Sequence, residues 1–221
     1  MSDAPEPRPA ATVIVARQGE GRVEVLTLRR APGSRFAPGF VVFPGGTVDE
    51  EDAALAVRLF ADEDEAARAC AVRELYEETG LLLTADGLAE APPGGPFEGL
   101  GFRPPMPSRL VEVSRWVAPE FLEVRFDARF FAVAAPAGLR LVPDGVEIAE
   151  ARWVGPASVL SENAAGEAPL MWPTLVMLEA LARCRMVEEV LALEVRQVAP
   201  PIATTRRRVG FPEGVRGASS S

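Results

Sequence analysis

The sequence predicts a mixed α/β fold built around one domain. Its 221 residues are enough for one domain with additions, at roughly 150 residues per domain. Short apolar runs rich in β-branched residues, which are typical of strands, occur in both halves of the chain. Between them, residues 64–80 are the clearest helix, with acidic residues at the start, an Ala-rich interior and a terminating glycine.

The first half of the chain opens with a tail over residues 1–10, which are rich in Pro and polar residues. A hairpin of two apolar strands follows, and then V-V-F-P-G-G-T-V, whose two glycines predict strand, turn and strand. In order, we expect strands at 11–17 and 23–29, the strand-turn-strand unit at 41–48, a short helix at 51–60, the helix at 64–80 and a strand that begins with residues 81–83.

The second half begins with a long loop, because residues 91–107 hold six prolines and four glycines. Strands are expected at 111–117, 125–134 and 151–154, a helix at 173–185 with Pro173 in its first turn, and either helix or strand at 188–195. Residues 199–221 carry Pro, Ser and an Arg run and are expected to form a tail. The domain is therefore expected to span residues 11–198.

The composition excludes several kinds of active site. There are 32 acidic and 23 basic residues, a net charge of −9, and every basic residue is Arg because the chain contains no Lys or His. A Ser-His-Asp triad, a P-loop lysine, a His-rich zinc site and a pyridoxal-phosphate lysine are all impossible. Any acid, base or metal chemistry must come from carboxylates.

The partners and compartment are also limited by composition. The acidic balance argues against a nucleic-acid surface, and no stretch approaches the roughly 18 apolar residues of a membrane helix. The N-terminus lacks a basic region followed by an apolar run, so a cytoplasmic protein is expected. Cys70 and Cys184 lie in apolar, helix-like stretches and are expected to be small buried hydrophobic residues.

Three carboxylates share one edge of the helix at 64–80. Residues 73–81 read R-E-L-Y-E-E-T-G-L, which places Glu77 and Glu78 three and four residues after Glu74. Like charges this close repel, and a hard divalent cation such as Mg²⁺ would turn the repulsion into ligation. The alternative is that the three glutamates only solvate an exposed helix face.

The surrounding residues resemble the Nudix hydrolase signature, G-x5-E-x7-R-E-U-x-E-E-x-G-U, where U is a bulky apolar residue. Residues 65–81 match the part that starts at the first Glu, which aligns Glu65 with it. Gly46 and Glu65 are separated by 18 residues where the signature has 5, an insertion of 18 − 5 = 13 at about residues 50–62. The inserted sequence resembles the lengthened signature of the coenzyme A diphosphatase branch, as do residues 125–133, 144–154 and 172–181. The resemblance covers about residues 11–185.

The resemblance implies a Nudix-type α/β/α sandwich with a mixed β-sheet and a divalent-metal site for Mg²⁺ or Mn²⁺. Arg73 would orient the cluster, and Glu65 would hydrogen-bond or help to hold the metal site. The metal ligands would be Glu74, Glu77 and Glu78 with the backbone carbonyl of Gly45 or Gly46.

The chemistry then needs a proton acceptor, because metal-bound water attacks a phosphorus atom and gives up a proton. The acceptor is expected to be a glutamate of the signature or Glu147, which lies near the family's downstream acidic position; otherwise Glu147 is a polar residue on an exposed strand face. Arg29, Arg30 and Arg35 precede the F-P-G-G turn and could bind phosphate bidentately, or could only balance surface charge.

The leading expectation is therefore a metal-dependent hydrolase that cleaves the diphosphate linkage of a small molecule, with coenzyme A or acyl-coenzyme A as the first guess. ADP-ribose, NADH and nucleotide sugars are the alternative substrates, because one fold supports many specificities. A second alternative is a non-catalytic module that senses a nucleotide in the same cleft. The resemblance also implies a homodimer.

Overall fold

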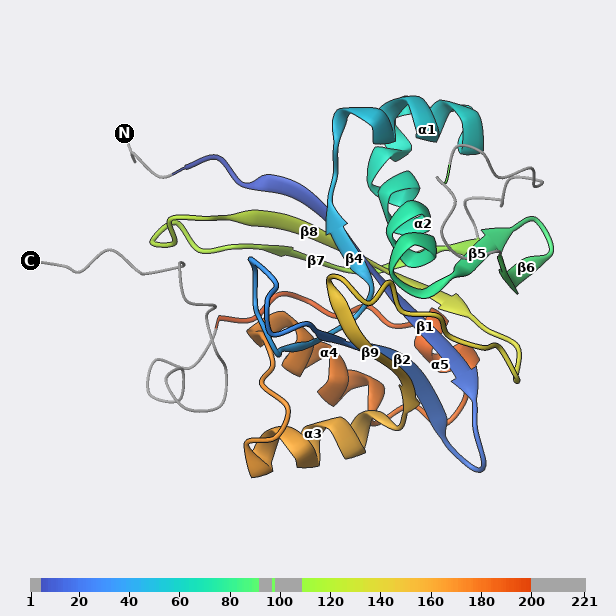
Figure 1. Cartoon of the computed structure of the whole chain (residues 1–221), viewed down its shortest axis with the longest axis vertical. Coiled ribbons are helices and arrows are strands. Elements are labelled where there is room, and N and C mark those ends of the chain that lie inside the picture. Colours follow the sequence, from blue (N-terminus) through green and yellow to red (C-terminus); the bar gives the residue numbers. More distant parts are fainter. Residues whose placement is uncertain (1–4, 92–96, 98–108, 200–221) are drawn as a thin grey trace, which may run out of the picture.

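Strand β1 (Arg8–Gln18) is the centre of the sheet in the computed structural model, which describes residues 5–91, 97 and 109–199 (Figure 1). On one side β1 runs parallel to β8 (Phe126–Ala134) along its first nine residues. On the other side it pairs with two antiparallel strands, first β4 (Gly45–Thr47) and then β2 (Val23–Arg30). The separation of β2 from the start of β1 leaves room for the turn that carries the two glycines.

The remaining strands extend this sheet on both sides, so that seven described strands form one mixed sheet. β3 (Val41–Val42) and β9 (Ile148–Val154) pair with β2, and β7 (Val111–Val117) pairs with β8, all antiparallel. β5 (Leu81–Thr84) and β6 (Gly87–Glu90) form a separate hairpin directly after α2.

Helices cover both faces of the sheet (Figure 1). One layer contains α1 (Glu50–Phe60), the 3₁₀ turn η1 (Glu63–Glu65) and α2 (Ala66–Thr79). The opposite layer contains α3 (Pro156–Ala165), α4 (Trp172–Leu181) and α5 (Val187–Leu191). The expected α/β/α sandwich with a mixed sheet is confirmed.

Two hydrophobic cores fill the space between the sheet and these layers. Val13 and Val15 of β1 face the core under α1 and α2, whereas Ile14 and Ala16 face the core under α3, α4 and α5. This alternation follows from the two-residue period of a strand, and it explains why β1 is apolar at successive positions.

The N-terminal tail was predicted too long, at residues 1–10, because β1 begins at Arg8. Arg8, Pro9 and Ala10 are already part of β1, because β8 supplies a parallel neighbour for their backbone. Residues 1–4 and 200–221 and most of the expected loop at 91–107 lie outside the described residues. Nothing in the described part of the chain is both helical and apolar over a length that would cross a membrane.

Candidate functional site

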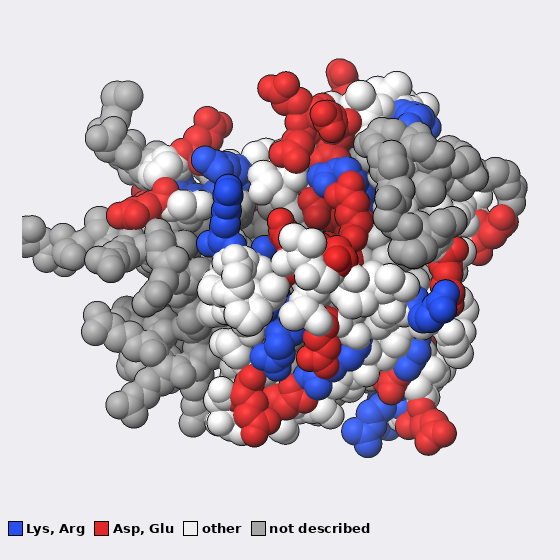
Figure 2. Space-filling model, viewed as in Figure 1, with Lys and Arg blue, Asp and Glu red and all other residues white. Residues whose placement is uncertain are grey.

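Helix α2 presents the charged cluster from one of its edges. Its other sides are apolar and pack into the core through residues such as Cys70, Val72 and Leu75, and Gly80 ends it in the left-handed conformation with φ 70°. This amphipathic arrangement fixes the helix, so that Arg73, Glu74, Glu77 and Glu78 reach the surface or the nearby turn as a group. Figure 2 shows acidic side chains gathered over α1 and α2 with basic side chains among them.

Arg73 is the centre of the cluster. Its Nε and Nη2 donate to Asp52 Oδ1 and Oδ2 at 2.8 and 2.9 Å, a bidentate pair. Its Nη1 donates to Glu74 Oε1 at 2.9 Å and to Glu77 Oε2 at 3.0 Å. The hydrogen bonds to Asp52 are the largest cause of a raised pKa at Arg73, which therefore stays charged.

Asp52 was not anticipated as part of the site. It is fully buried at 0 % exposure, it lies in the first turn of α1, and its Oδ2 also accepts the Asp49 N–H at 2.9 Å. Five residues separate Gly46 from Asp52, the G-x5 spacing of the signature, so Asp52 stands where the signature has its first Glu. The spacing from Gly46 therefore could have identified Asp52 from the sequence, with Asp in place of the Glu of the signature.

Glu65, the residue aligned with that Glu from the sequence, is not brought to the cluster. It forms an ion pair with Arg68, one turn along α2, and its position at the end of η1 separates it from Arg73. The 13 additional residues accordingly lie after Asp52. They continue α1 and form η1, so the two halves of the signature meet in space through the Asp52–Arg73 pair.

The two glycines of β4 allow the turn to approach α2 closely. Gly45 has φ 154°, and a Cβ on it would overlap the carbonyl oxygen of Ala11; a Cβ on Gly46 would overlap the Glu74 carboxylate. The Gly45 N–H donates to Glu78 Oε2 at 2.9 Å. The Gly46 carbonyl oxygen lies 3.8 Å from Cys70 Sγ. Only glycine permits both contacts of the turn with its neighbours.

Burial raises the pKa of two of the carboxyl groups. At Glu78 the rise is large, caused first by burial and then by the charge of Glu74, and the Gly45 N–H only partly offsets it. At Glu74 burial is again the first cause, partly offset by Arg73. Both groups are therefore held in an environment that favours a nearby cation.

This donor set fits a hard divalent cation, because it consists of carboxylate oxygens beside backbone oxygens of a tight turn. Among the described residues, no three acidic or cysteine side chains already converge as a finished metal site. The reason is local: Arg73 holds Glu74 and Glu77, and Gly45 holds Glu78. Glu77, whose side chain is 44 % exposed, has the most freedom to turn toward a cation.

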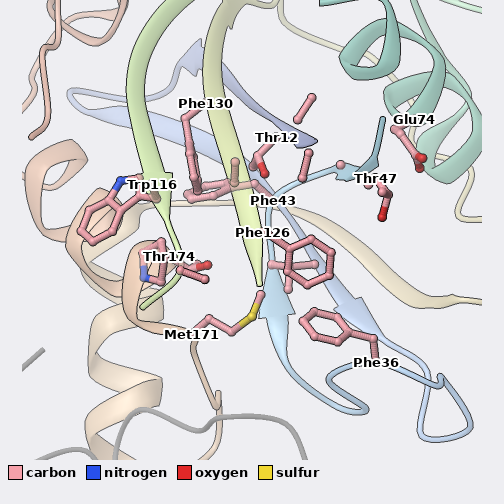
Figure 3. Close-up of a pocket in the computed structure, with 18 of the residues that line it drawn as sticks. Thr12, Phe36, Phe43, Thr47, Glu74, Trp116, Phe126, Phe130, Met171 and Thr174 are labelled. Atoms are coloured by element: carbon pink, nitrogen blue, oxygen red, sulfur yellow. The ribbon is translucent and has the colours of Figure 1, made fainter. Parts of the chain in front are cut away.

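A cavity of about 920 Å³ opens beside the cluster, at the edge of the sheet where β1 and β8 begin and β7 ends. Glu74, Glu77 and Glu78 line it together with Arg30. Figure 3 shows Glu74 and Thr47 at one side of this space and Trp116 at the other, with Phe43 and Phe126 between them. The volume is at the upper end of the range for small-molecule sites.

Of the three predicted arginines, Arg30 alone lines the cavity. Its Nε donates to the Phe36 carbonyl at 2.8 Å and its Nη2 to Glu147 at 3.0 Å, so the guanidinium is fixed. Arg29 instead donates to the carbonyl oxygens of Gly39 and Glu167. Arg35 is exposed and does not line the cavity.

Glu147 lines the cavity rim with its side chain 62 % exposed, as the partner of Arg30. Asp144, three residues earlier, was not anticipated. Its Oδ1 accepts N–H groups of Val146, Glu147 and Ile148 at 2.9–3.1 Å and so fixes the loop before β9. Its position after a proline and before a glycine is typical of such a turn.

Comparisons with known proteins agree with this geometry. The family sequence model of the NUDIX domain matches residues 6–173 of this chain. A crystal structure of a NUDIX hydrolase from Alicyclobacillus acidocaldarius is 32 % identical, with a TM-score of 0.73 over 88 % of this chain and 99 % of that one. The NUDIX domain of Shewanella oneidensis NrtR, solved with ADP ribose, is 14 % identical with a TM-score of 0.52 over 79 % of this chain and 86 % of that one, and shows the fold alone.

Two curated relatives are longer than the matched region. "Putative nudix hydrolase 7" of Caenorhabditis elegans is 29 % identical over 80 % of this chain and 61 % of its own length. "Acyl-coenzyme A diphosphatase NUDT19" of Gallus gallus is 31 % identical over 49 % of this chain and 40 % of its own length. The chain therefore spans less than two thirds of either relative.

Proposed function

The chain belongs to the Nudix hydrolase family, and we propose that it cleaves the diphosphate linkage of coenzyme A or an acyl-coenzyme A with the help of Mg²⁺ or Mn²⁺. The observation that carries the proposal is the carboxylate edge of α2, assembled by Arg73 against the Gly45–Gly46 turn and open to a large cavity. The partial similarity to an acyl-coenzyme A diphosphatase supports this substrate class.

Glu74, Glu77 and Glu78 would hold the metal, with a carbonyl oxygen of Gly45 or Gly46. A bound divalent cation lowers the pKa of water and neutralises charge on the diphosphate. Arg73 keeps Glu74 and Glu77 on one edge of the helix, and Asp52 keeps Arg73 in place. These residues orient the site before substrate arrives, which is the condition for efficient electrostatic catalysis.

The reaction is an in-line displacement. A water oxygen attacks phosphorus, the bond from that phosphorus to the bridging oxygen breaks, and the departing phosphate takes the electron pair. Glu77 or Glu78 accepts the proton of the water. Arg30, held by Glu147 and the Phe36 carbonyl, faces the phosphate groups, so the role we propose for Glu147 is to position Arg30.

The test is turnover of a panel of diphosphates with Mg²⁺, Mn²⁺ or chelator, with products identified by phosphorus NMR. The panel contains coenzyme A, acyl-coenzyme A, ADP-ribose, NADH and nucleotide sugars. Metal-dependent formation of 3′,5′-ADP and a phosphopantetheine supports the proposal. Preference for another diphosphate overturns the substrate, and binding without turnover of any compound would favour a nucleotide sensor.

Glu77→Gln and Glu78→Gln test the site itself, because they keep side-chain shape and remove charge. Each is expected to lower kcat about 100-fold or more. Glu179→Gln is the matched control, since Glu179 is an exposed helical glutamate on α4 that does not line the cavity. Equal activity of all three variants would contradict the proposed site.

We also propose a homodimer, on the family resemblance. Light scattering across micromolar concentrations is expected to give twice the chain mass of 23.6 kDa. A constant monomeric mass would refute it.

A further inference from the structure

Two arginines line the cavity among the described residues, Arg30 and Arg8. Arg30 donates to the Phe36 carbonyl and to Glu147. Arg8 is exposed, and no ion pair or side-chain hydrogen bond joins its guanidinium to another residue that the structure describes. The charge of Arg8 is therefore available to a ligand, in a cavity whose described lining also holds six acidic residues.

The backbone fixes Arg8 at the end of the sheet. Arg8 is the first residue of β1 and the register partner of Phe126 in β8, and its N–H donates to the Arg125 carbonyl at 2.9 Å. The carbonyl oxygen of the next residue, Pro9, accepts the Val48 N–H at 2.9 Å. Neighbouring segments on both sides thus fix the Cα position of Arg8, and its side chain can adjust to a ligand.

The distance from Arg8 to the carboxylate end of the cavity follows from the geometry of the sheet. Arg8, Ala10 and Thr12 alternate onto one face of β1, and all three line the cavity. Thr12 is the register partner of Gly45, whose N–H donates to Glu78. Four residues of strand separate the Cα atoms of Arg8 and Thr12 by about 13 Å. An extended arginine side chain, with five bonds from Cα to Cζ, covers about 6 Å, so the guanidinium can come within roughly 7 Å of the Thr12–Gly45 pair.

The surface beside Arg8 suits a nucleoside. Phe126 packs edge-to-face against Phe36 with 5.6 Å between the ring centroids, and both rings line the cavity (Figure 3). Ala10 and its register partner Ala128 also line it, and their small side chains leave the sheet surface open to a sugar. Every base has a flat face that stacks on an aromatic ring, so this surface does not require one particular base.

We infer that Arg8 binds a phosphate group attached to the ribose of the substrate, so that substrates with this additional phosphate are preferred over those without it. The inference rests on the proposed function, because the diphosphate must lie at the carboxylate edge of α2. Phosphorus atoms on the 3′ and 5′ oxygens of one ribose are six bonds apart, and six bonds of an extended chain span about 7 Å. This span agrees with the reach of Arg8. A guanidinium binds phosphate well because it offers two parallel N–H donors.

The first experiment measures kcat/KM within two pairs of diphosphates, each of which differs by one phosphate group. Coenzyme A and 3′-dephospho-coenzyme A test the 3′ position, and NADPH and NADH test the 2′ position. A preference of at least tenfold for the phosphorylated member of either pair supports the inference, and the pair that shows it identifies the position. Equal values within both pairs overturn the inference and leave the diphosphatase function intact. Absence of turnover for every diphosphate would instead overturn the proposed function.

Arg8→Gln tests the side chain itself, because it removes the charge at an exposed position. Loss of a charge-assisted hydrogen bond is expected to lower kcat/KM about tenfold for the phosphorylated substrate and less than twofold for its partner. Arg8→Lys keeps the charge without the paired donors and should retain part of the preference. Arg22→Gln is the matched control, since Arg22 is also exposed at the start of a strand but does not line the cavity. If Arg8→Gln and Arg22→Gln have the same effect, the inference fails.

Binding of 3′,5′-ADP and of 5′-AMP tests Arg8 independently of catalysis. Neither nucleotide contains a diphosphate linkage, so both can be titrated calorimetrically with Mg²⁺ present. The parent protein is expected to bind 3′,5′-ADP with a Kd at least tenfold lower than that for 5′-AMP, and Arg8→Gln is expected to bind both equally. Equal affinities in the parent protein would overturn the inference even where coenzyme A is cleaved. Discrimination that survives in Arg8→Gln would overturn it too, because another residue would then hold the phosphate.

Discussion

Asp52 and Glu65 each have one of the two spacings expected of the first acidic residue of the signature. In the structure Asp52 is the residue that pairs with Arg73, whereas Glu65 pairs with Arg68. Asp52→Asn removes the charge opposite a mostly buried guanidinium, so we expect the free energy of unfolding to fall by about 3 kcal/mol, the lower end for a broken buried pair. Glu74 and Glu77 still neutralise Arg73, which is why the loss is not larger. Urea denaturation measures it.

Glu65→Gln is the control for this prediction. Its ion pair with Arg68 lies at the helix start, and removing it is expected to change stability by no more than about 1 kcal/mol and leave kcat within twofold. If Glu65→Gln costs more activity than Asp52→Asn, the assignment of Asp52 is wrong.

Gly45 and Gly46 are adjacent, but the Ala11 backbone limits the space at Gly45 and the Glu74 side chain limits it at Gly46. Gly45→Ala meets backbone at a positive φ and is expected to destabilise the fold by about 2 kcal/mol or more. Gly46→Ala meets only the end of the flexible Glu74 side chain, so the fold should be retained while that carboxylate is displaced. We expect a melting temperature near that of the parent protein with turnover reduced at least tenfold; the reverse order of effects would contradict this reading.

At the residue scale, the sequence predicted the helix edge well because Glu74, Glu77 and Glu78 depend only on helical spacing. Asp52 was missed because Glu65 and Arg73 have the E-x7-R spacing of the signature. Glu65 was therefore aligned with the first Glu, and the G-x5 spacing from Gly46 to Asp52 was overlooked. The role of Arg30 could be separated from those of Arg29 and Arg35 only by tertiary packing, which decides which side chain faces the cavity.

Residues 193–198 run beside β7, and Gln197 and Val198 line the cavity. Val195 forms an isolated parallel bridge with Ser114, and its N–H donates to the Val113 carbonyl at 2.8 Å. Gln197 continues this contact with its side chain, because its amide pairs with both backbone groups of Val117. The Gln197 side chain thus forms the two hydrogen bonds that a neighbouring strand would form with Val117.

Gln197→Ala is expected to remove about 1 kcal/mol of local stability, since two hydrogen bonds at a partly exposed edge are lost. Hydrogen exchange at the Val117 amide should accelerate about fivefold. Gln18→Ala, which removes a single hydrogen bond to the Arg185 carbonyl, is the control and should leave the Val117 amide unchanged. Unaltered exchange in both variants would show that the segment is held by other contacts.

At the element scale, most elements were predicted close to their bounds, including short ones such as β5, whereas α3 and β6 were not predicted. α2, β7 and β8 fall close to their expected positions because burial on defined faces governs their sequences. α3 was missed although Pro156 in its first turn and Gly166 after its end are typical helix signals. Residues 188–195 contain both alternatives, since α5 ends at Leu191 and Val195 then pairs with β7.

The whole molecule brings opposite layers to one cavity. The carboxylates come from α2 and Trp172 from α4 in the opposite layer, and both line the cavity at the end of the sheet where β4, and not β2, pairs with the first residues of β1. Sequence alone could not show this, since Glu74 and Trp172 are separated by 172 − 74 = 98 positions and are brought together only by the register of the sheet.

Metal binding should therefore be visible in the stability of the entire fold. The carboxylates of α2 contact the β4 turn and, through Arg73, the start of α1, so a cation bound there would stabilise elements that unfold together. At a metal concentration of 100 times Kd the gain is about 2.7 kcal/mol, which corresponds to a rise of roughly 5–10 °C in Tm. Calorimetry with Mg²⁺, Mn²⁺ and chelator measures it.

The variants make this test specific to the cluster. Glu78→Gln removes a carboxylate that is held by the Gly45 N–H, so the metal-dependent rise in Tm should shrink or disappear although the protein still folds. Glu179→Gln, on the opposite layer, should retain the full rise. If Glu78→Gln retains it as well, the cation that stabilises the protein is bound elsewhere, and the carboxylate edge of α2 is not its site.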